Sequence, residues 1–359
     1  MTQKQSATSI AILCSCAILS KYLVILPEYM VKAVGNAAWI DVLSKCILAA
    51  LSLTIILILY KPFSPMTLSD VAASYLGKAS SIAFNCIYII AFTVFNAILL
   101  RLLSEALSTV IATTAPDEFF NLFILIPVFI AAYCGTGPTR NLCLIIFPFV
   151  IITLFTVCLA LIPHYRISNI MPIFGIDKTQ LTRGIFTKHF GFTETILLFF
   201  FAPRLGKFQE LKKAAITTFT IITAVSVLFT LAYCLTVPYP ASKDFFLPFY
   251  QMTRMIKSGA FLQRLEPIVV FVWTSFAMCS MSVLIAITAR LSTYGAPEGV
   301  KKSFTPVITI ITFFISMLPS SESAAFSFYE KLINLSTILF PVIPFFVLVI
   351  ARIKKRRLS

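Results

Sequence analysis

Residues 8–33 read TSIAILCSCAILSKYLVILPEYMVKA, an almost continuous apolar run that contains Lys21, Pro27 and Glu28. A helix rises about 1.5 Å per residue, so this run is long enough to cross the roughly 30 Å hydrocarbon core of a bilayer. The run is continuous and does not alternate between apolar and polar positions, which favours a helix over a strand. Similar runs recur along the chain, and they predict a bundle of membrane-spanning helices.

The composition also indicates a membrane protein. Hydrophobic residues make up 59% of the 359 positions, charged residues make up 12%, and the mean hydropathy is +0.95. Soluble domains carry about 25% charged residues, so one water-soluble core cannot hold this much apolar surface. We expect an all-α membrane protein with about ten transmembrane helices in a single domain, residues 1–359. The expected spans are 8–33, 37–60, 82–112, 119–135, 141–163, 185–202, 213–237, 266–289, 304–319 and 331–352.

The distribution of basic residues predicts the orientation of the bundle. Of the 29 Lys and Arg residues, sixteen fall on the side that holds both termini, and ten fall on the opposite side. Eight of those ten lie in the two longest loops, 164–188 and 239–264, which carry little weight in the positive-inside rule. We therefore expect both termini to be cytoplasmic. The net charge of +15 then indicates membrane lipid headgroups as the anionic partner, and not nucleic acid.

Two charged pairs inside the apolar runs have the spacing of ion pairs on one helix. Asp41 and Lys45 are four residues apart in the second span, and Arg101 and Glu105 are four apart in the third. Residues at this spacing are neighbours on a helix face, so each pair can neutralise itself locally. We interpret both pairs as structural ion pairs or interfacial anchors.

Lys21 and Glu194 differ from these pairs because neither has an opposite charge within a helical turn. A lone charge in hydrocarbon costs at least a few kcal/mol, so each side chain is expected to face the interior of the bundle. One arrangement that satisfies both is a pair across the bundle. The two residues are our strongest candidates for a functional site.

The first and sixth spans also share a polar interruption. The first contains Ser20-Lys21-Tyr22 followed by Pro27, and the sixth contains the stretch 189–194, His-Phe-Gly-Phe-Thr-Glu. Interrupted helices at matching positions in two halves predict a five-plus-five inverted repeat with broken helices 1 and 6, its halves roughly 1–163 and 164–359. Broken helices expose backbone groups in mid-membrane, an environment that suits a zwitterion such as an amino acid.

We expect the substrate-binding site at these two interruptions. One wall is predicted from the first span, the opposite wall from the sixth, and the closing residues from the third and eighth spans, for which ordinary helix packing is the alternative. The candidate residues are Ser20, Lys21, Tyr22, Gly191, Phe192, Thr193, Glu194, Asn96, Trp273 and Thr274.

The sequence gives no support to an enzyme. It contains no phosphate-binding glycine loop, no His-Glu-x-x-His motif and no nucleophile elbow. The two histidines, His164 and His189, lack partners of the kind that a metal site needs. We expect no catalytic residue, no metal and no cofactor.

Several motifs in order along the chain resemble one family. They are Thr67-Leu68 with Leu76-Gly77-Lys78, then Asn169-Ile170-Met171-Pro172, then Phe192-Thr193-Glu194-Thr195 followed by Pro203, and finally Phe261-Leu262-Gln263-Arg264-Leu265-Glu266 with Trp273. The set resembles the spore germination permeases, the B subunits of nutrient germinant receptors in endospore-forming bacteria. That family is part of the amino acid–polyamine–organocation superfamily. Two departures from its pattern are the lack of a glycine before Leu26-Pro27, and Thr193 where the family has a glycine.

The resemblance implies a ten-helix transporter-like fold in the spore inner membrane. It also implies an A subunit and a lipoprotein C subunit as partners, and a small-molecule germinant bound between helices 1, 3, 6 and 8. Our leading hypothesis is a germinant-sensing subunit of a spore nutrient receptor. The alternatives are a proton-coupled amino acid or amine transporter, and a membrane scaffold whose pocket is vestigial.

Overall fold

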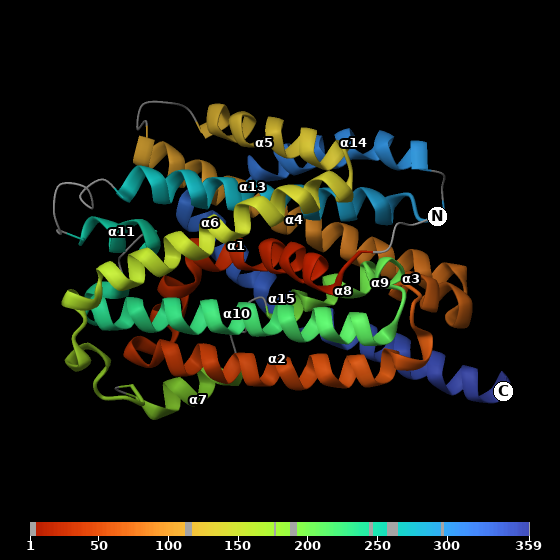
Figure 1. Ribbon diagram of the computed structural model, residues 1–359, viewed down its shortest axis with the longest axis horizontal. Coiled ribbons are helices and arrows are strands. Elements are labelled where there is room, and N and C mark those ends of the chain that lie inside the picture. Colours follow the sequence, from red (N-terminus) through yellow and green to blue (C-terminus); the bar gives the residue numbers. More distant parts are fainter. Residues whose placement is uncertain are drawn as a thin grey trace.

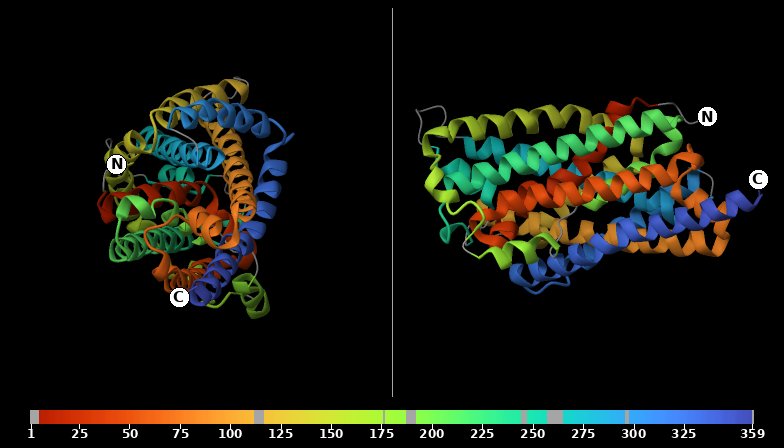
Figure 2. Two further views of the ribbon diagram at one scale, coloured as in Figure 1. Left: turned by 90° about the vertical axis from the view of Figure 1, so that its right-hand side faces the viewer. Right: turned by 90° about the horizontal axis from the view of Figure 1, so that it is seen from below.

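A computed structural model describes residues 5–111, 117–175, 177–186, 192–243, 247–256, 265–295 and 298–358. The described residues are almost entirely helical, and the long helices run along the longest axis of the molecule (Figure 1). Both termini lie at the same end of this bundle (Figures 1 and 2). Among the described residues, six segments are long and apolar enough to cross a membrane, and three shorter apolar helices accompany them.

The long helices coincide with the expected spans, apart from the sixth. They are α1 (Ala7–Val34), α2 (Ala38–Tyr60), α4 (Lys78–Ile111), α5 (Asp117–Tyr133), α6 (Thr136–Ala160), α10 (Phe208–Thr236), α13 (Leu265–Ser292), α14 (Glu298–Ser316) and α15 (Glu322–Leu358). The all-α membrane fold is thereby confirmed. The number of membrane crossings and the five-plus-five repeat stay predictions.

The sixth span is broken, as the sequence predicts. In place of one helix it consists of the 3-10 turn η6 (Phe192–Ile196), α8 (Leu197–Phe200) and α9 (Ala202–Leu205). The short helix α7 (Lys178–Phe186) precedes these pieces in the chain. Pro203 stands in the first turn of α9, where its missing N–H leaves no helical hydrogen bond unmade.

The break that we expected in the first span is wrong. Helix α1 is continuous through Ser20, Lys21 and Tyr22, and Pro27 lies inside it. No glycine lies between residues 20 and 26, and glycine is the residue that lowers the energetic cost of an unwound backbone. The helix ends instead at Gly35, whose φ of 67° is a conformation that favours glycine.

Helix α1 is central to the bundle, and it packs against α2, α6, α10 and α13. The outer helices expose apolar side chains along one face. On α6, for example, Ile145, Phe149, Ile152 and Phe155 are each more than half exposed. Spacings of three and four residues put these side chains on one stripe, as expected for a surface that faces lipid. The interior therefore forms around α1, where the candidate residues lie.

A short helical segment lies between α2 and α4 at the end of the bundle that holds the termini (Figure 1). It consists of α3 (Leu68–Val71) and a π-helical stretch, Ala72–Leu76. Thr67 starts α3 with a capping box in which its side chain and that of Asp70 each accept a backbone N–H. At the opposite end, α11 (Pro248–Arg254) packs against α1 and α13.

Candidate functional site

An ion pair between Lys21 of α1 and Glu194 of η6 is the centre of the candidate site. The Lys21 Nζ lies 2.5 Å from each carboxylate oxygen of Glu194. The two residues are only 3% and 2% exposed. They are 173 positions apart in the sequence, so the pair joins the first span to the break in the sixth.

Aromatic rings surround this pair. The Lys21 Nζ lies 4.6 Å from the centroid of the Phe95 ring on α4, a cation–π distance. The Phe95 ring makes an edge-to-face contact with Tyr329 of α15, with centroids 6.3 Å apart. Tyr22 and Tyr329 are both fully buried and both lie within electrostatic range of the Glu194 carboxylate. Helices α1, α4, η6 and α15 thus converge on one charged contact in an aromatic environment.

The burial of this pair sets its energetics. Two charges taken from water lose their hydration, and their mutual attraction offsets that loss only when the geometry is good. Removing one partner of a buried pair typically costs about 3–5 kcal/mol, because it leaves an uncompensated charge. Lys21 and Glu194 therefore need each other, or a ligand that supplies the same charges.

Ser20 directly precedes Lys21 in the sequence and Asn96 directly follows Phe95, and each has unused hydrogen-bonding capacity. Both are fully buried, Ser20 in α1 and Asn96 in α4. The Ser20 hydroxyl and the Asn96 carbonyl oxygen have no hydrogen-bond partner among the described residues. Buried polar atoms are usually satisfied, so these two are available to a polar ligand.

Two hydrogen bonds from side chains to backbone carbonyl oxygens join the helices around Lys21. The Asn96 amide donates to the carbonyl oxygen of Met281 on α13 at 3.4 Å, and the Ser280 hydroxyl donates to the carbonyl oxygen of Ala17 on α1 at 2.9 Å. Helices α1, α4 and α13 are therefore joined about one helical turn from Lys21. Helix α13 packs against both α1 and α4, while the closing role that we assigned to the third and eighth spans stays a prediction.

The eighth-span candidates lie elsewhere on α13. Trp273 is 3% exposed, and its indole N–H has no hydrogen-bond partner among the described residues. Thr274 lines a cavity of about 490 Å³ between α4, α11 and α13, together with Tyr250 and Glu266. Lys21 and Glu194 are not among the residues that line this cavity.

The three remaining candidates cannot be placed in the same detail. Gly191 and the side chains of Phe192 and Thr193 lie outside the described residues. The backbone of Phe192 and Thr193 forms the first part of η6, directly before Glu194. Their role as the second wall of the site stays a prediction.

Two residues of the site were missed by the sequence reasoning. Phe95 is one of 35 phenylalanines, and its position directly before Asn96 was the only signal that it faces the interior. Tyr329 lies two positions before the expected start of the tenth span, in a stretch with no pattern that points to Glu194. Neither residue belongs to a motif that periodicity alone would select.

The two charged pairs predicted in the second and third spans both form. On α2 the Lys45 Nζ lies 2.5 Å from Asp41 Oδ2, and on α4 the Arg101 Nε lies 2.7 Å from Glu105 Oε1. Among the described residues there is no group of three or more His, Cys, Asp or Glu side chains that could hold a metal ion.

Comparisons with known proteins agree with this architecture. The spore permease family model, described as "Spore germination protein", matches residues 5–325. Spore germination protein YndE of Bacillus subtilis (strain 168) is 23% identical over 336 residues, covering 89% of this chain and 88% of the relative. Spore germination protein GerLB of Bacillus cereus is 22% identical over 290 residues, covering 79% of this chain and 77% of the relative.

A solved structure shares the fold at low sequence identity. It is a Na⁺-coupled sialic acid symporter in a substrate-bound, outward-open state, and it is 11% identical with a TM-score of 0.63. The match covers 94% of this chain and 78% of the symporter chain. The helical bundle thus shares its fold with that symporter, and the family match extends over nearly all of the bundle. The chain belongs to the spore germination permease family.

Proposed function

We propose that the chain is the germinant-sensing membrane subunit of a spore nutrient receptor, and that it binds a small molecule such as an amino acid beside Lys21 and Glu194. The observation that carries the proposal is the buried ion pair between α1 and η6. An ammonium and a carboxylate at 2.5 Å offer complementary groups to the carboxylate and ammonium of a zwitterion. A ligand of that kind can replace each partner without leaving either charge unpaired.

Ligand binding would separate two segments that the ion pair now holds together. The pair joins the continuous helix α1 to the short pieces η6 and α8, which are not locked into one long helix. A ligand shifts such an equilibrium only if it binds one arrangement more tightly than the other. In our proposal the arrangement with Lys21 and Glu194 apart is the one that binds, and partner subunits of the A and C type respond to it.

The family and the charge distribution both support a proposed location for the subunit. We place the subunit in the spore inner membrane, with both termini in the cytoplasm. The support is the excess of basic residues at the end of the bundle that holds the termini, including Lys354, Lys355, Arg356 and Arg357.

The test compares two substitutions at one position in spores that carry the complete receptor. Germination is followed against the concentration of each of a panel of amino acids, for Lys21→Arg and Lys21→Met. We expect Lys21→Arg to retain a response at higher concentrations and Lys21→Met to lose it. Lys45→Met is the matched control, because Lys45 is equally buried but pairs with Asp41 on its own helix. A normal dose response from Lys21→Met, with the protein present at normal abundance, contradicts the proposal.

A second candidate function is a proton-coupled amino acid or amine transporter. The observation in its favour is the shared fold with a Na⁺-coupled symporter. The chain alone, reconstituted in liposomes, separates the two functions. Concentrative uptake of a labelled amino acid under a proton gradient favours the transporter, whereas saturable binding without uptake favours the sensor.

A further inference from the structure

A small cavity lies beside α9, the last of the three pieces into which the sixth span is broken. Its volume is about 110 Å³, and it lies where α5 ends and α6 begins, beside α9, α13 and α14. Three cationic side chains line it, each from a different helix: Arg204 from α9, Arg290 from α13 and Lys302 from α14. None of the described residues that line it is acidic.

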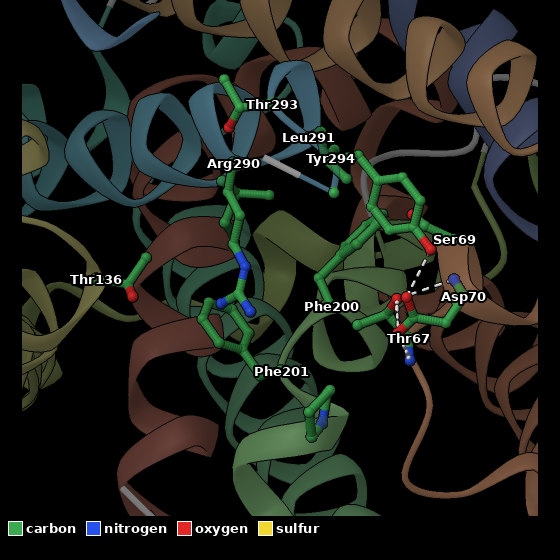
Figure 3. Close-up of a pocket in the computed structure, with 13 residues that line it drawn as sticks. Thr67, Ser69, Asp70, Thr136, Phe200, Phe201, Arg290, Leu291, Thr293 and Tyr294 are labelled. Atoms are coloured by element: carbon green, nitrogen blue, oxygen red, sulfur yellow. Dashed lines mark hydrogen bonds between the residues drawn. The ribbon is translucent and has the colours of Figure 1, made fainter. Parts of the chain in front are cut away.

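Arg290 is shared between this cavity and a larger one beside it, of about 170 Å³. Figure 3 shows the larger cavity, with the Arg290 side chain extending into it from the α13 backbone. Asp70 lies across the cavity and is already engaged, since it accepts hydrogen bonds from Thr67 Oγ1 and the Tyr294 hydroxyl, each at 2.6 Å. In the part of the chain that the structure describes, Arg290 has no ion-pair partner within 4.0 Å.

The other two cations are held at the cavity by aromatic rings. The Lys302 Nζ lies 5.8 Å from the centroid of the Tyr133 ring, and the Arg204 guanidinium carbon lies 5.7 Å from that of Phe201. The contact with Tyr133 orients the Lys302 ammonium without neutralising its charge. Arg290 and Lys302 therefore bring two like charges to one hollow, and an anion in the hollow would lower their repulsion.

The backbone adds further positive potential to the same cavity. Gly135, with a φ of 93°, precedes α6, and no side chain caps this 25-residue helix. The N-terminus of a helix carries a partial positive charge and free N–H groups, which favour anions. Gly135 and Thr136 both line the cavity, so the start of α6 faces the same space as the three cations.

We propose that this cavity binds a phosphate group, supplied either by an anionic lipid headgroup or by inorganic phosphate. Guanidinium groups match the geometry of phosphate oxygens, and the Thr136 hydroxyl can donate to one of them. The volume suits a phosphate group. The residues involved are separate from Lys21 and Glu194, so this inference does not rest on the proposed function.

Equilibrium binding of radiolabelled inorganic phosphate tests the site directly. The full chain is placed in nanodiscs of zwitterionic lipid, and binding is measured for the wild type, Arg290→Gln, Arg290→Lys and Lys302→Gln. We expect Arg290→Gln and Lys302→Gln each to weaken binding about tenfold or more, and Arg290→Lys to restore part of the affinity. Lys213→Gln is the control of equal charge change, because Lys213 is exposed on α10 near the same end and lines neither cavity.

A second arm identifies the source of the phosphate. In nanodiscs that contain phosphatidylglycerol, a lipid site predicts a higher thermal unfolding midpoint and weaker binding of inorganic phosphate, and both effects disappear in Arg290→Gln. A site for free phosphate predicts saturable binding that phosphatidylglycerol does not alter. The proposal is overturned if neither phosphate nor phosphatidylglycerol has an effect, or if Lys213→Gln weakens binding as much as Arg290→Gln.

Discussion

Two buried lysine–carboxylate pairs in this bundle have the same shortest distance between their charged groups, but they connect different parts of the fold. Asp41–Lys45 and Lys21–Glu194 each bring the lysine Nζ to within 2.5 Å of a carboxylate oxygen, and each is almost fully buried. The first pair lies one turn apart on α2, whereas the second joins α1 to η6. A local pair moves with its helix as a unit. A pair between two segments has to break when those segments separate, so it is the one that can respond to a ligand.

The side chains that surround the two pairs also differ. The Lys45 Nζ also contacts Met30 Sδ at 3.4 Å, and α7 packs so closely that a Cβ added to Gly184 would lie 3.5 Å from Asp41 Oδ1. That Cβ would also lie 2.3 Å from Val34 Cγ1. The local pair thus lies against a third, closely packed helix, and Asp41 Oδ1 has no hydrogen-bond partner among the described residues. Lys21 instead contacts both carboxylate oxygens of Glu194 and lies over an aromatic ring.

The largest expected effect comes from removing only one partner of the Lys21–Glu194 pair. Lys21→Met leaves the Glu194 carboxylate buried without a partner, and we expect it to destabilise the protein by about 3–5 kcal/mol. The double variant Lys21→Met/Glu194→Gln removes both charges and should recover much of that loss. Thermal unfolding of the purified proteins in one detergent measures both. Equal losses in the single and double variants would show that the pair is not coupled.

Removing the lysine of the local pair Asp41–Lys45 tests whether the two pairs differ in function. Lys45→Met leaves Asp41 uncompensated in a buried site, so we expect a loss of about 3 kcal/mol in the same unfolding assay. The germination dose response, however, should stay within about twofold of the wild type, since no ligand group reaches this pair in our account. The variant is scored at matched receptor abundance. A shift of the dose response as large as that of Lys21→Met would mean that the two pairs do not differ in function.

A smaller effect is expected from the ring beside Lys21. Phe95→Leu keeps an apolar side chain but removes the cation–π contact, which is worth about 1–2 kcal/mol when desolvated. We expect a modest fall in the unfolding midpoint together with a changed dose response. Phe92→Leu, on the same helix one turn earlier, is the matched control, because the cation–π contact of Lys21 is with Phe95. Identical effects of the two substitutions would mean that Phe95 contributes packing alone.

The smallest effect concerns α7, which covers the local pair. Hydrogen bonds from the Thr179 hydroxyl and backbone N–H hold the pKa of Asp177 below its usual value, and they anchor the start of α7. This stabilisation is therefore complete above the unfolded pKa of about 3.9 and is lost as the pH falls through the lower folded pKa.

Hydrogen exchange of residues 178–186 measures this contribution. Asp177→Asn should exchange faster than the wild type at pH 7, and the difference should vanish once the pH is below the folded pKa. A difference that persists unchanged in strong acid would show that the Asp177 charge is not its source.

The sequence was sufficient for features whose causes are local. Long apolar runs predict the spans, and four-residue spacing predicts Asp41–Lys45 and Arg101–Glu105, because both patterns depend only on helix geometry. The Lys21–Glu194 contact could be predicted because each charge lacks a local partner. The positions of Phe95 and Tyr329 could not be predicted, since nothing in a phenylalanine-rich chain indicates which rings face the interior. The break expected at residues 20–22 was wrong because a polar residue in a helix does not unwind it when a partner from another segment satisfies it.

The most direct test of the account is a structure of the receptor with its germinant bound, determined by electron cryomicroscopy. We expect the Lys21 Nζ and the Glu194 carboxylate to have moved apart, with the charged groups of the ligand between them and the Asp41–Lys45 pair unchanged. A ligand bound elsewhere, with Lys21 still in direct contact with Glu194, would contradict the account.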